Sequence, residues 1–510
     1  MRPYTVAVLA LVLLPLACIA QTKPGDPMPP RSWVDKDTGH RIWRLSDEPN
    51  SGAFYFNING YTPDNKQMIY SAPDGIHVLD LATRATKLLV ANPKQPDGTP
   101  ASGREPGVVH ILVAGHKTNS VFYTTTDANH VTAVYKADTN TGAVRRLTEV
   151  PHPPNTSGWS VVTVNADETL IAGTYVEGDD TGRQYGSNLP ARPAGAAPGA
   201  AGNPDNRVGS AVQGPHYQPP NKSQMMVARL AAKLPLVLFT LRLEPGPNGA
   251  KPGDVKPLLH STDWVNHLLF SPTDPTLLMY CHEGIWQDVD RLWMIHTDGT
   301  HNTLVHKRTM YMEIWGHEFW GPDGETIWYQ WDYPRNADSN FVAGYNVKTG
   351  ERFAYHTGRD DGSIHVNVTK DLSLFTGDGT FPGQGPTAHD SAWIELFRPQ
   401  MIRGDSLAVN SPDFWQPGIF HTEHLVNMSH HNYHEEPNVR FTPDNKMVIF
   451  TGNMFGPSYV FGVEVDKAVN PPAADVVSTT ELANRYNPVN PPLRGPVVPA
   501  ASPAPPAPAK

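Results

Sequence analysis

One short motif recurs along the chain and constrains its fold more than any other feature. Each copy is the end of an apolar strand, a tight turn that contains Asp and in most copies Pro, and a second apolar strand. An example is Tyr61-Thr-Pro-Asp-Asn65 before Met68-Ile-Tyr70, and the other copies begin at Val164, Phe270, Trp320, Val368 and Phe441. A weaker unit, Ser120-Val-Phe-Tyr-Thr-Thr125, lies between the first two. Seven such units predict an all-β fold, a seven-bladed β-propeller.

Two unrelated β-sandwiches are the alternative fold, and they would explain the strands but not the recurring phase. Composition agrees with short strands and many turns, because 51 of the 510 residues are Pro and 42 are Gly. The formal charge is -10, and no run rich in Lys or Arg occurs. A nucleic acid is therefore a poor candidate partner. The sequence says nothing about oligomeric state.

The first 20 residues have the pattern of a secretory signal peptide. Arg2 precedes an apolar run from Thr5 to Leu14, and small residues follow as far as Ala20. This run is too short for a membrane span, and no other stretch reaches the length that a span needs. We expect export to the periplasm or the medium. Lipidation at Cys18 is the alternative, which Pro15 disfavours; cleavage after Ala20 would leave Cys281 alone and exclude an internal disulfide.

Two segments fall outside the repeat. Residues 178–222 are rich in Gly, Pro and Ala and are expected to form a long insertion within the third blade. Residues 487–510 form a Pro/Ala-rich tail that we expect to be disordered. The propeller domain is therefore predicted to span residues 32–468.

Histidine is the residue type that composition singles out, with 22 in the chain and 13 of them between His282 and His434. Polar residues stand three positions before four of the repeat anchors, on the innermost strand of each predicted blade: His267, His317, His365 and Asn438. Side chains at one phase of this strand should point toward the channel axis, where propellers bind ligands. Hydrogen bonding between adjacent blades is the structural alternative.

A second dense group of polar residues runs from His421 to Asn438 and contains five histidines with Glu435 and Glu436. Imidazole nitrogens mixed with carboxylate and amide oxygens suit Mn²⁺, Zn²⁺ or another first-row divalent ion. No spacing matches a known zinc motif, so a histidine-rich loop on a solvated rim is the alternative.

A third motif, Cys281-His282-Glu283-Gly284, precedes Asp290-Arg291. The arginine can bind a carboxylate of a substrate with two hydrogen bonds, or pair with Asp290 or Glu283. We assign His267 and His282 to substrate binding.

Several of these motifs are shared with one enzyme family. Cys281-His-Glu-Gly284, Val289-Asp-Arg-Leu-Trp293, Gly316-His-Glu-Phe-Trp-Gly-Pro-Asp-Gly324, Thr376-Gly-Asp-Gly379 and Phe450-Thr-Gly-Asn-Met454 resemble the oligogalacturonate lyases of polysaccharide lyase family 22. The resemblance covers roughly residues 32–468 and is specific from His267 onward. It implies a seven-bladed propeller, a Mn²⁺-type ion in the channel mouth, and cleavage of short uronate oligomers by β-elimination, as in pectin degradation.

The same resemblance implies roles for individual residues. It puts the catalytic base at His317, a substrate-binding arginine at Arg291 and the first metal ligand at His365. Members of the family carry Gln-x-x-His-Pro-His before the last Phe-Thr-Pro turn, but those three ligand positions are Tyr433, Glu436 and Asn438 here. The metal set that we predict is therefore His365, His431, Glu436 and Asn438.

The chemistry of β-elimination suits these residue types. The C5 proton of a uronate becomes acidic when charge on the adjacent carboxylate is stabilised by a cation. The alternative function is that of a non-catalytic periplasmic β-propeller that binds a protein or a glycan. A serine peptidase is excluded, because no GxSxG motif occurs and only 42 residues follow Ala468.

Overall fold

The computed structural model describes residues 28–103, 105–178, 222–335, 340–358, 360–380, 392–402 and 414–487. The predicted signal peptide at residues 1–20 lies outside these residues, as does nearly all of the 178–222 insertion and the 487–510 tail. In the described part of the chain, two α-helices, α1 (Lys222–Ala232) and α2 (Thr479–Tyr486), accompany the β-strands. The all-β prediction is confirmed. Neither helix is long and apolar enough to cross a membrane.

The described strands form six hydrogen-bonded sheets, and the first three follow one another in the sequence. They are β3 (Gln67–Ala72), β4 (Gly75–Asp80) and β5 (Thr86–Ala91); β6 (His110–Ala114), β7 (Ser120–Thr126), β8 (Thr132–Asp138) and β9 (Val144–Glu149); and β10 (Thr156–Val164), β11 (Leu170–Glu177), β12 (Leu236–Arg242) and β13 (Val255–Ser261). Each is an antiparallel meander.

The next two sheets cover the second half of the chain. The fourth consists of β14 (Trp264–Phe270), β15 (Leu277–Glu283), β16 (Leu292–His296) and β17 (Thr303–Leu304). The fifth has eight strands: β18 (Ile314–Trp320), β19 (Thr326–Asp332), β20 (Asn340–Asn346), β21 (Arg352–His356), β22 (Val366–Val368), β23 (Phe375–Gly377), β24 (Trp393–Met401) and β25 (Trp415–Asn427). Its order, β18-β19-β20-β21-β25-β24-β23-β22, joins two meanders through a parallel pairing of β21 with β25.

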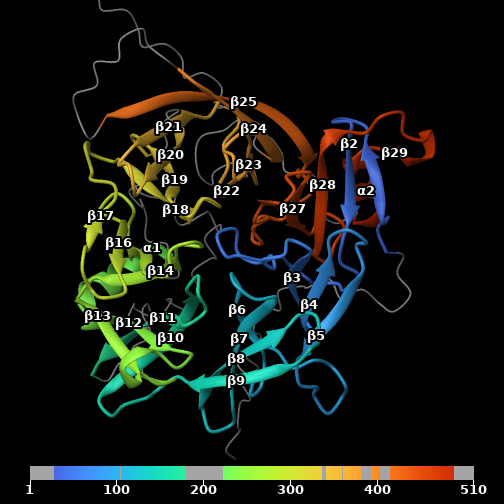
Figure 1. Cartoon of the computed structure of the whole chain (residues 1–510). Helices are drawn as coiled ribbons and strands as arrows, with labels where there is room; N and C mark the ends of the chain where they lie inside the picture. The colour runs from blue at the N-terminus through green and yellow to red at the C-terminus, as the bar shows by residue number, and fades with distance from the viewer. Residues whose placement is uncertain are drawn as a thin grey trace, which may run out of the picture.

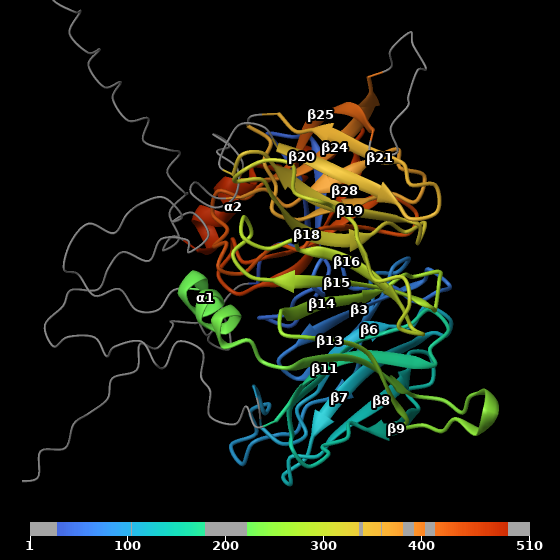
Figure 2. The same cartoon turned by 90° about the vertical axis from the view of Figure 1, so that its left-hand side faces the viewer.

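The sixth sheet joins the two ends of the described chain. It contains β26 (Arg440–Phe441), β27 (Met447–Gly452), β28 (Tyr459–Lys467), β2 (His40–Arg44), β1 (Ser32–Asp35) and β29 (Val476–Val477). Strand β2 pairs antiparallel with β28, so an N-terminal strand completes a C-terminal sheet. The six sheets surround a common centre, and this pairing closes the ring (Figure 1). Both helices lie at the same end of the ring (Figure 2).

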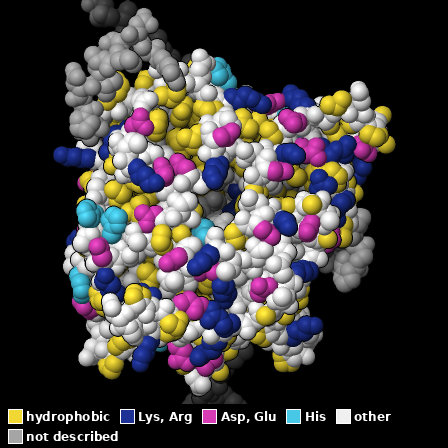
Figure 3. All heavy atoms as spheres, viewed as in Figure 1, with side chains coloured by type: hydrophobic (Ala, Val, Ile, Leu, Met, Phe, Trp, Pro, Cys, Tyr) yellow, Lys and Arg dark blue, Asp and Glu magenta, His cyan; other side chains and the backbone are white. Residues whose placement is uncertain are grey.

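The apolar core lies between neighbouring sheets. Strand β15 is an example: residues Leu277 to Cys281 are all buried, as expected for a strand covered on both faces. The buried side chains form clusters that each draw on adjacent sheets, such as Leu236, Leu238, Leu278 and Tyr280. The Pro-Asp turns lie at the end of the ring opposite the helices. Figure 3 looks onto that end and shows it hollowed at the centre.

A buried contact holds the closing strands together. Trp33 on β1 is 1% exposed and packs edge-on against Phe455 and Phe461, at centroid distances of 5.5 and 6.1 Å. Its indole N–H donates to Thr479 Oγ1 at 3.0 Å, which ties β1 to α2. The same side chain therefore links both ends of the described chain.

We expect Trp33→Ala to lower the free energy of unfolding by about 3–5 kcal/mol, because it empties a large core position at the ring closure. Urea denaturation followed by tryptophan fluorescence and circular dichroism measures this loss. The control is Val469→Ala, at a side chain that is 86% exposed, which should change stability by less than about 0.5 kcal/mol. Equal stabilities of the two variants would contradict this account of closure.

Candidate active site

A short segment before β3 enters the centre of the ring, the region that we call the channel (Figure 1). The buried guanidinium of Arg440 holds the segment by donating to the carbonyls of Phe54, Tyr55 and Ile58. The Phe56 N–H donates to Asn438 Oδ1 at 3.0 Å, and Asn57 Nδ2 donates to the Glu318 carbonyl at 3.1 Å. We call residues 54–59 the crossing segment. It brings two aromatic side chains into the channel, and sequence analysis assigned it no role.

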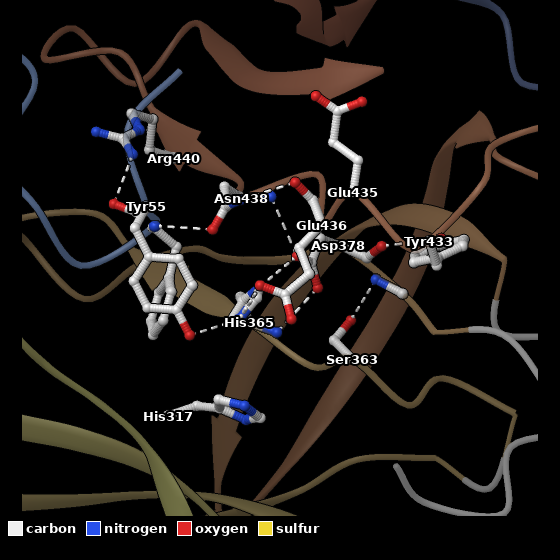
Figure 4. A network of polar contacts seen from close by, with 12 residues as sticks. Tyr55, His317, Ser363, His365, Asp378, Tyr433, Glu435, Glu436, Asn438 and Arg440 are labelled. Atoms are coloured by element: carbon white, nitrogen blue, oxygen red, sulfur yellow. Dashed lines mark hydrogen bonds and ion pairs between the residues drawn. The ribbon is translucent and has the colours of Figure 1, made fainter. Parts of the chain in front are cut away.

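His365 lies fully buried at the centre of a polar network (Figure 4). Its Nδ1 is 2.7 Å from Asp378 Oδ2, and its backbone N–H donates to the other oxygen of the same carboxylate at 2.9 Å. The Asp378 carboxylate accepts a hydrogen bond from Nδ1–H. Nε2 is 3.2 Å from the Tyr55 hydroxyl and 3.7 Å from Glu436 Oε2. Phe56 stacks on the imidazole at 4.4 Å.

His317 lies beside His365, with ring centroids 5.0 Å apart. Its Nδ1 is 3.0 Å from Gln330 Oε1, and the amide nitrogen of Gln330 donates to Asp332 Oδ1 at 3.4 Å. These two hydrogen bonds orient the Gln330 amide so that its oxygen faces the His317 imidazole. In the neutral ring Nδ1 therefore carries the proton and Nε2 is the basic atom. Trp286 packs against the imidazole edge at 4.9 Å.

Three of the four residues predicted at one phase share an unusual backbone. His267, His317 and Asn438 have φ values of 48°, 50° and 58°, in the left-handed region that non-glycine residues rarely occupy. For the two histidines the strand pairing also shifts register there, as in a β-bulge. A bulge re-aims a side chain, and such outliers concentrate at functional sites. The position three residues before the repeat anchor thus has the same backbone conformation in three of the four units.

A buried ion-pair group lies beside these residues. Glu283 Oε1 accepts from Arg291 Nη1 at 2.9 Å, and Glu283 Oε2 is 2.8 Å from His267 Nε2. Arg291 also stacks on Trp286 at 4.6 Å. Of the pairings considered for Arg291, the structure therefore shows the one with Glu283; Asp290 is 3.8 Å from Arg308 instead. At 3% exposure the arginine is a buried charge, and His267 is the more exposed basic side chain of the group.

The charges of this group shift its pKa values in opposite directions. Burial alone would raise the pKa of Glu283, but Arg291 and His267 outweigh it and lower that pKa. Burial alone would lower the pKa of His267, but its hydrogen bond to Glu283 and the charge of buried Glu318 raise it. The pKa of Tyr55 is raised well above its usual value by burial and then by Glu436 and other carboxylates, so its hydroxyl stays protonated.

The remaining predicted residues are placed differently. Glu436 is half-exposed and faces His365, whereas Asn438 directs its amide nitrogen to the Glu436 carbonyl at 2.7 Å. His431 is buried with both ring nitrogens engaged, by the Glu435 carbonyl at 2.7 Å and the Asn453 N–H at 3.2 Å. Burial lowers its pKa to about 4. The hydrogen bonds of His431 are therefore to its own loop and to the turn after β27 rather than to His365.

His282 alternates with Cys281 and Glu283 along β15 and so faces the other side of the sheet. It packs against Trp293 at 5.0 Å and Tyr280 at 5.6 Å. The structure thus does not bring His282 together with the channel group. Tyr55, Phe56 and Gln330 were not predicted from the sequence. Asp378 was not predicted as a site residue either, although it lies in the Thr376-Gly-Asp-Gly379 motif. The crossing segment carries no repeat signal, so only the fold could place its aromatic residues.

Comparison with known proteins finds one family for the second half of the chain. Residues 248–469 match the family model described as oligogalacturonate lyase. An oligogalacturonide lyase of Pectobacterium atrosepticum is 25% identical over 224 residues, which cover 42% of this chain and 54% of that protein. An oligogalacturonate lyase of Dickeya dadantii is 24% identical over 226 residues, 43% of this chain and 54% of that protein. The chain thus spans about half the length of the curated relatives it matches.

Solved structures extend the similarity of fold over most of the chain. An oligogalacturonate lyase in complex with manganese superimposes with a TM-score of 0.56 at 19% identity, covering 87% of this chain and 96% of that one. An oligogalacturonate lyase from Vibrio parahaemolyticus gives a TM-score of 0.58 at 18% identity, covering 86% and 96%. At such identities the likeness concerns the fold alone.

The hydrogen bonds that run from His317 through Gln330 end at the buried carboxyl group of Asp332. Burial raises the pKa of Asp332 from 3.8 to about 7. The folded state therefore binds more protons than the unfolded state between about pH 4 and pH 7, and stability falls as pH rises through this window. The loss from this group is on the order of 4 kcal/mol.

We expect Asp332→Asn to remove this loss, because the amide does not ionise. Urea denaturation of both proteins at a series of pH values measures it: the stability of the wild type should fall more steeply between about pH 4 and pH 7 than that of the variant. Parallel pH profiles would contradict the raised pKa.

Proposed function

We propose that the chain, whose residues 248–469 match the oligogalacturonate lyase family model, cleaves oligogalacturonides or related oligouronides by β-elimination. One observation carries the proposal: His317, with its Nδ1 held by Gln330, lies beside His365, whose Nε2 faces Glu436. A basic nitrogen and a potential cation site thus lie in one channel. That combination is what removal of a proton next to a carboxylate requires.

His317 is the base in this proposal. Its Nε2 takes the C5 proton of the uronate, the electron pair forms the C4–C5 double bond, and the C4–O bond breaks. The departing oxygen takes up a proton from solvent. Gln330 is a positioning residue, because it acts by keeping the other imidazole nitrogen protonated. The Tyr55 hydroxyl remains a neutral hydrogen-bond donor at the same site.

The donor atoms around His365 suit a divalent ion, with Mn²⁺ as the best candidate. The imidazole has the carboxylate partner on Nδ1 that metal-binding histidines commonly have, and Glu436 adds an oxygen near Nε2. Two carboxylates flank the imidazole, so the group gathers negative charge that a cation would balance. When bound, the ion supplies positive charge for the uronate carboxylate. Asn438 is a weaker ligand candidate, since its oxygen accepts from Phe56.

The ion-pair group contains two basic side chains and two carboxylates. In it, Arg291 and His267 are balanced by Glu283 and the buried Glu318 nearby. Such a balanced group orients a substrate carboxylate rather than attracting it strongly. Attraction of a polyanion to a chain with formal charge -10 must then come from the cation site. We therefore assign His267, with Arg291 behind it, to substrate orientation.

We also propose that the six sheets represent seven blades. The eight-stranded sheet consists of two meanders, β18 to β21 and β22 to β25, which join only through the parallel edge pairing of β21 with β25. Each meander has the strand number of a single blade. Export of the chain also remains our proposal, based on the sequence of residues 1–20, and N-terminal sequencing of the mature protein tests it.

The test of function is ultraviolet absorbance of the unsaturated product on incubation with oligogalacturonides and related oligouronides, with and without EDTA. We expect activity that EDTA lowers and added Mn²⁺ restores. His317→Ala should reduce kcat about 10²- to 10⁴-fold, because general-base catalysis contributes about that much. The matched control is His260→Ala, at an exposed histidine near Glu177, which should retain full activity. Absence of product with every uronate oligomer would refute the proposed function.

A further inference from the structure

A second group of metal-ligating side chains lies outside the channel site. Ligand atoms of Asp361, Glu395 and His424 all lie within 4.8 Å of one another. We propose that these three residues form a divalent-cation site, separate from the one at His365. Two carboxylates and one imidazole suit Mn²⁺ or Zn²⁺, and the remaining coordination positions would be filled by water.

The sheet itself positions two of the three ligands. Glu395 on β24 pairs directly with His424 on β25, so the two side chains share one face. The register shifts between Ile394 and Glu395, as in a bulge, which re-aims side chains at this point. Trp393 stacks on the His424 ring at 4.5 Å and an interplanar angle of 8°, which fixes the plane of the imidazole. These ligands are therefore ordered by the fold rather than by the ion.

Glu395 is a carboxylate with 0% exposure. Its Oε2 accepts from the Ser363 hydroxyl at 2.6 Å, and the Ser363 oxygen in turn accepts from the Gly379 N–H at 3.0 Å. This is the supporting hydrogen bond that orients carboxylate ligands in metal sites. Asp361 completes the group from the loop before β22, with Oδ1 3.7 Å from His424 Nε2.

Charge explains why a cation should bind here. Two carboxylates this close repel each other unless positive charge lies between them, and burial strengthens the repulsion. A cation held between the carboxylates supplies that charge, with His424 Nε2 as its nitrogen ligand.

The site has a structural link to the channel. Ser363 supports Glu395 and stands two residues before His365, while Gly379 follows Asp378, the partner of His365 (Figure 4). An ion bound by Asp361, Glu395 and His424 would therefore restrict the motion of the two backbone segments that hold His365 and Asp378. The inference does not depend on lyase activity, since it concerns metal content and stability.

The experiment measures metal binding by chelator-stripped protein at pH 7.5, with Mn²⁺ and Zn²⁺ as probes. Isothermal titration gives affinity, elemental analysis after dialysis gives stoichiometry, and thermal denaturation gives the metal-dependent shift in Tm. We expect His424→Ala and Glu395→Gln to lose one bound ion that His365→Ala keeps. Ser363→Ala should bind that ion at least about tenfold more weakly, as loss of a supporting hydrogen bond does in other sites.

The matched control is His421→Ala, on the same strand but paired with Gln400, which should bind metal as the wild type does. Tm values without metal show whether each variant is folded. If His424→Ala and Glu395→Gln bind metal with wild-type stoichiometry and affinity, or if the wild type binds no ion that depends on them, the proposal is wrong. Loss of binding in His365→Ala alone would instead concern the channel ion of the proposed function, so the two failures are distinguishable.

Discussion

The architecture of the channel depends on one buried carboxylate. Asp378 is fully buried and accepts hydrogen bonds from the His365 backbone, the His365 ring and the Asn438 backbone. Asn438 in turn accepts from the crossing segment, which carries Tyr55 and Phe56. One side chain thus holds the residues just before β22 and β26 together and, through Asn438, the crossing segment. A buried acceptor with three donors is hard to replace, since each donor would be left unpaired in a dry environment.

The all-β class could be predicted from the sequence because its signal is local and repeated. Each Pro-Asp turn falls between two apolar runs, and the phase of those turns predicted which residues share a position on the innermost strands. The left-handed backbone of His267, His317 and Asn438 agrees with that phase. The number of seven blades stays a prediction, because hydrogen bonding between β21 and β25 joins two meanders into one of six sheets.

The site was only partly predictable, for physical reasons that differ between residues. Tyr55 and Phe56 reach His365 only through ring closure, which no local pattern encodes. His431 belongs to a histidine-rich run, but its nitrogens are engaged by neighbouring backbone groups, and sequence spacing does not reveal such contacts. The position of His282, in contrast, follows from a simple rule. Side chains alternate along a regular strand, so His282 and Glu283 on β15 face opposite sides of the sheet.

The crossing segment also divides the centre of the ring. Phe56 stacks on His365 with one ring face, and together with Phe319 it also lines a cavity of about 350 Å³ at the Pro-Asp turn end. The Phe56 ring therefore stands between that cavity and the His365 imidazole. A molecule in the cavity would contact Phe56 and not His365, which does not line the cavity.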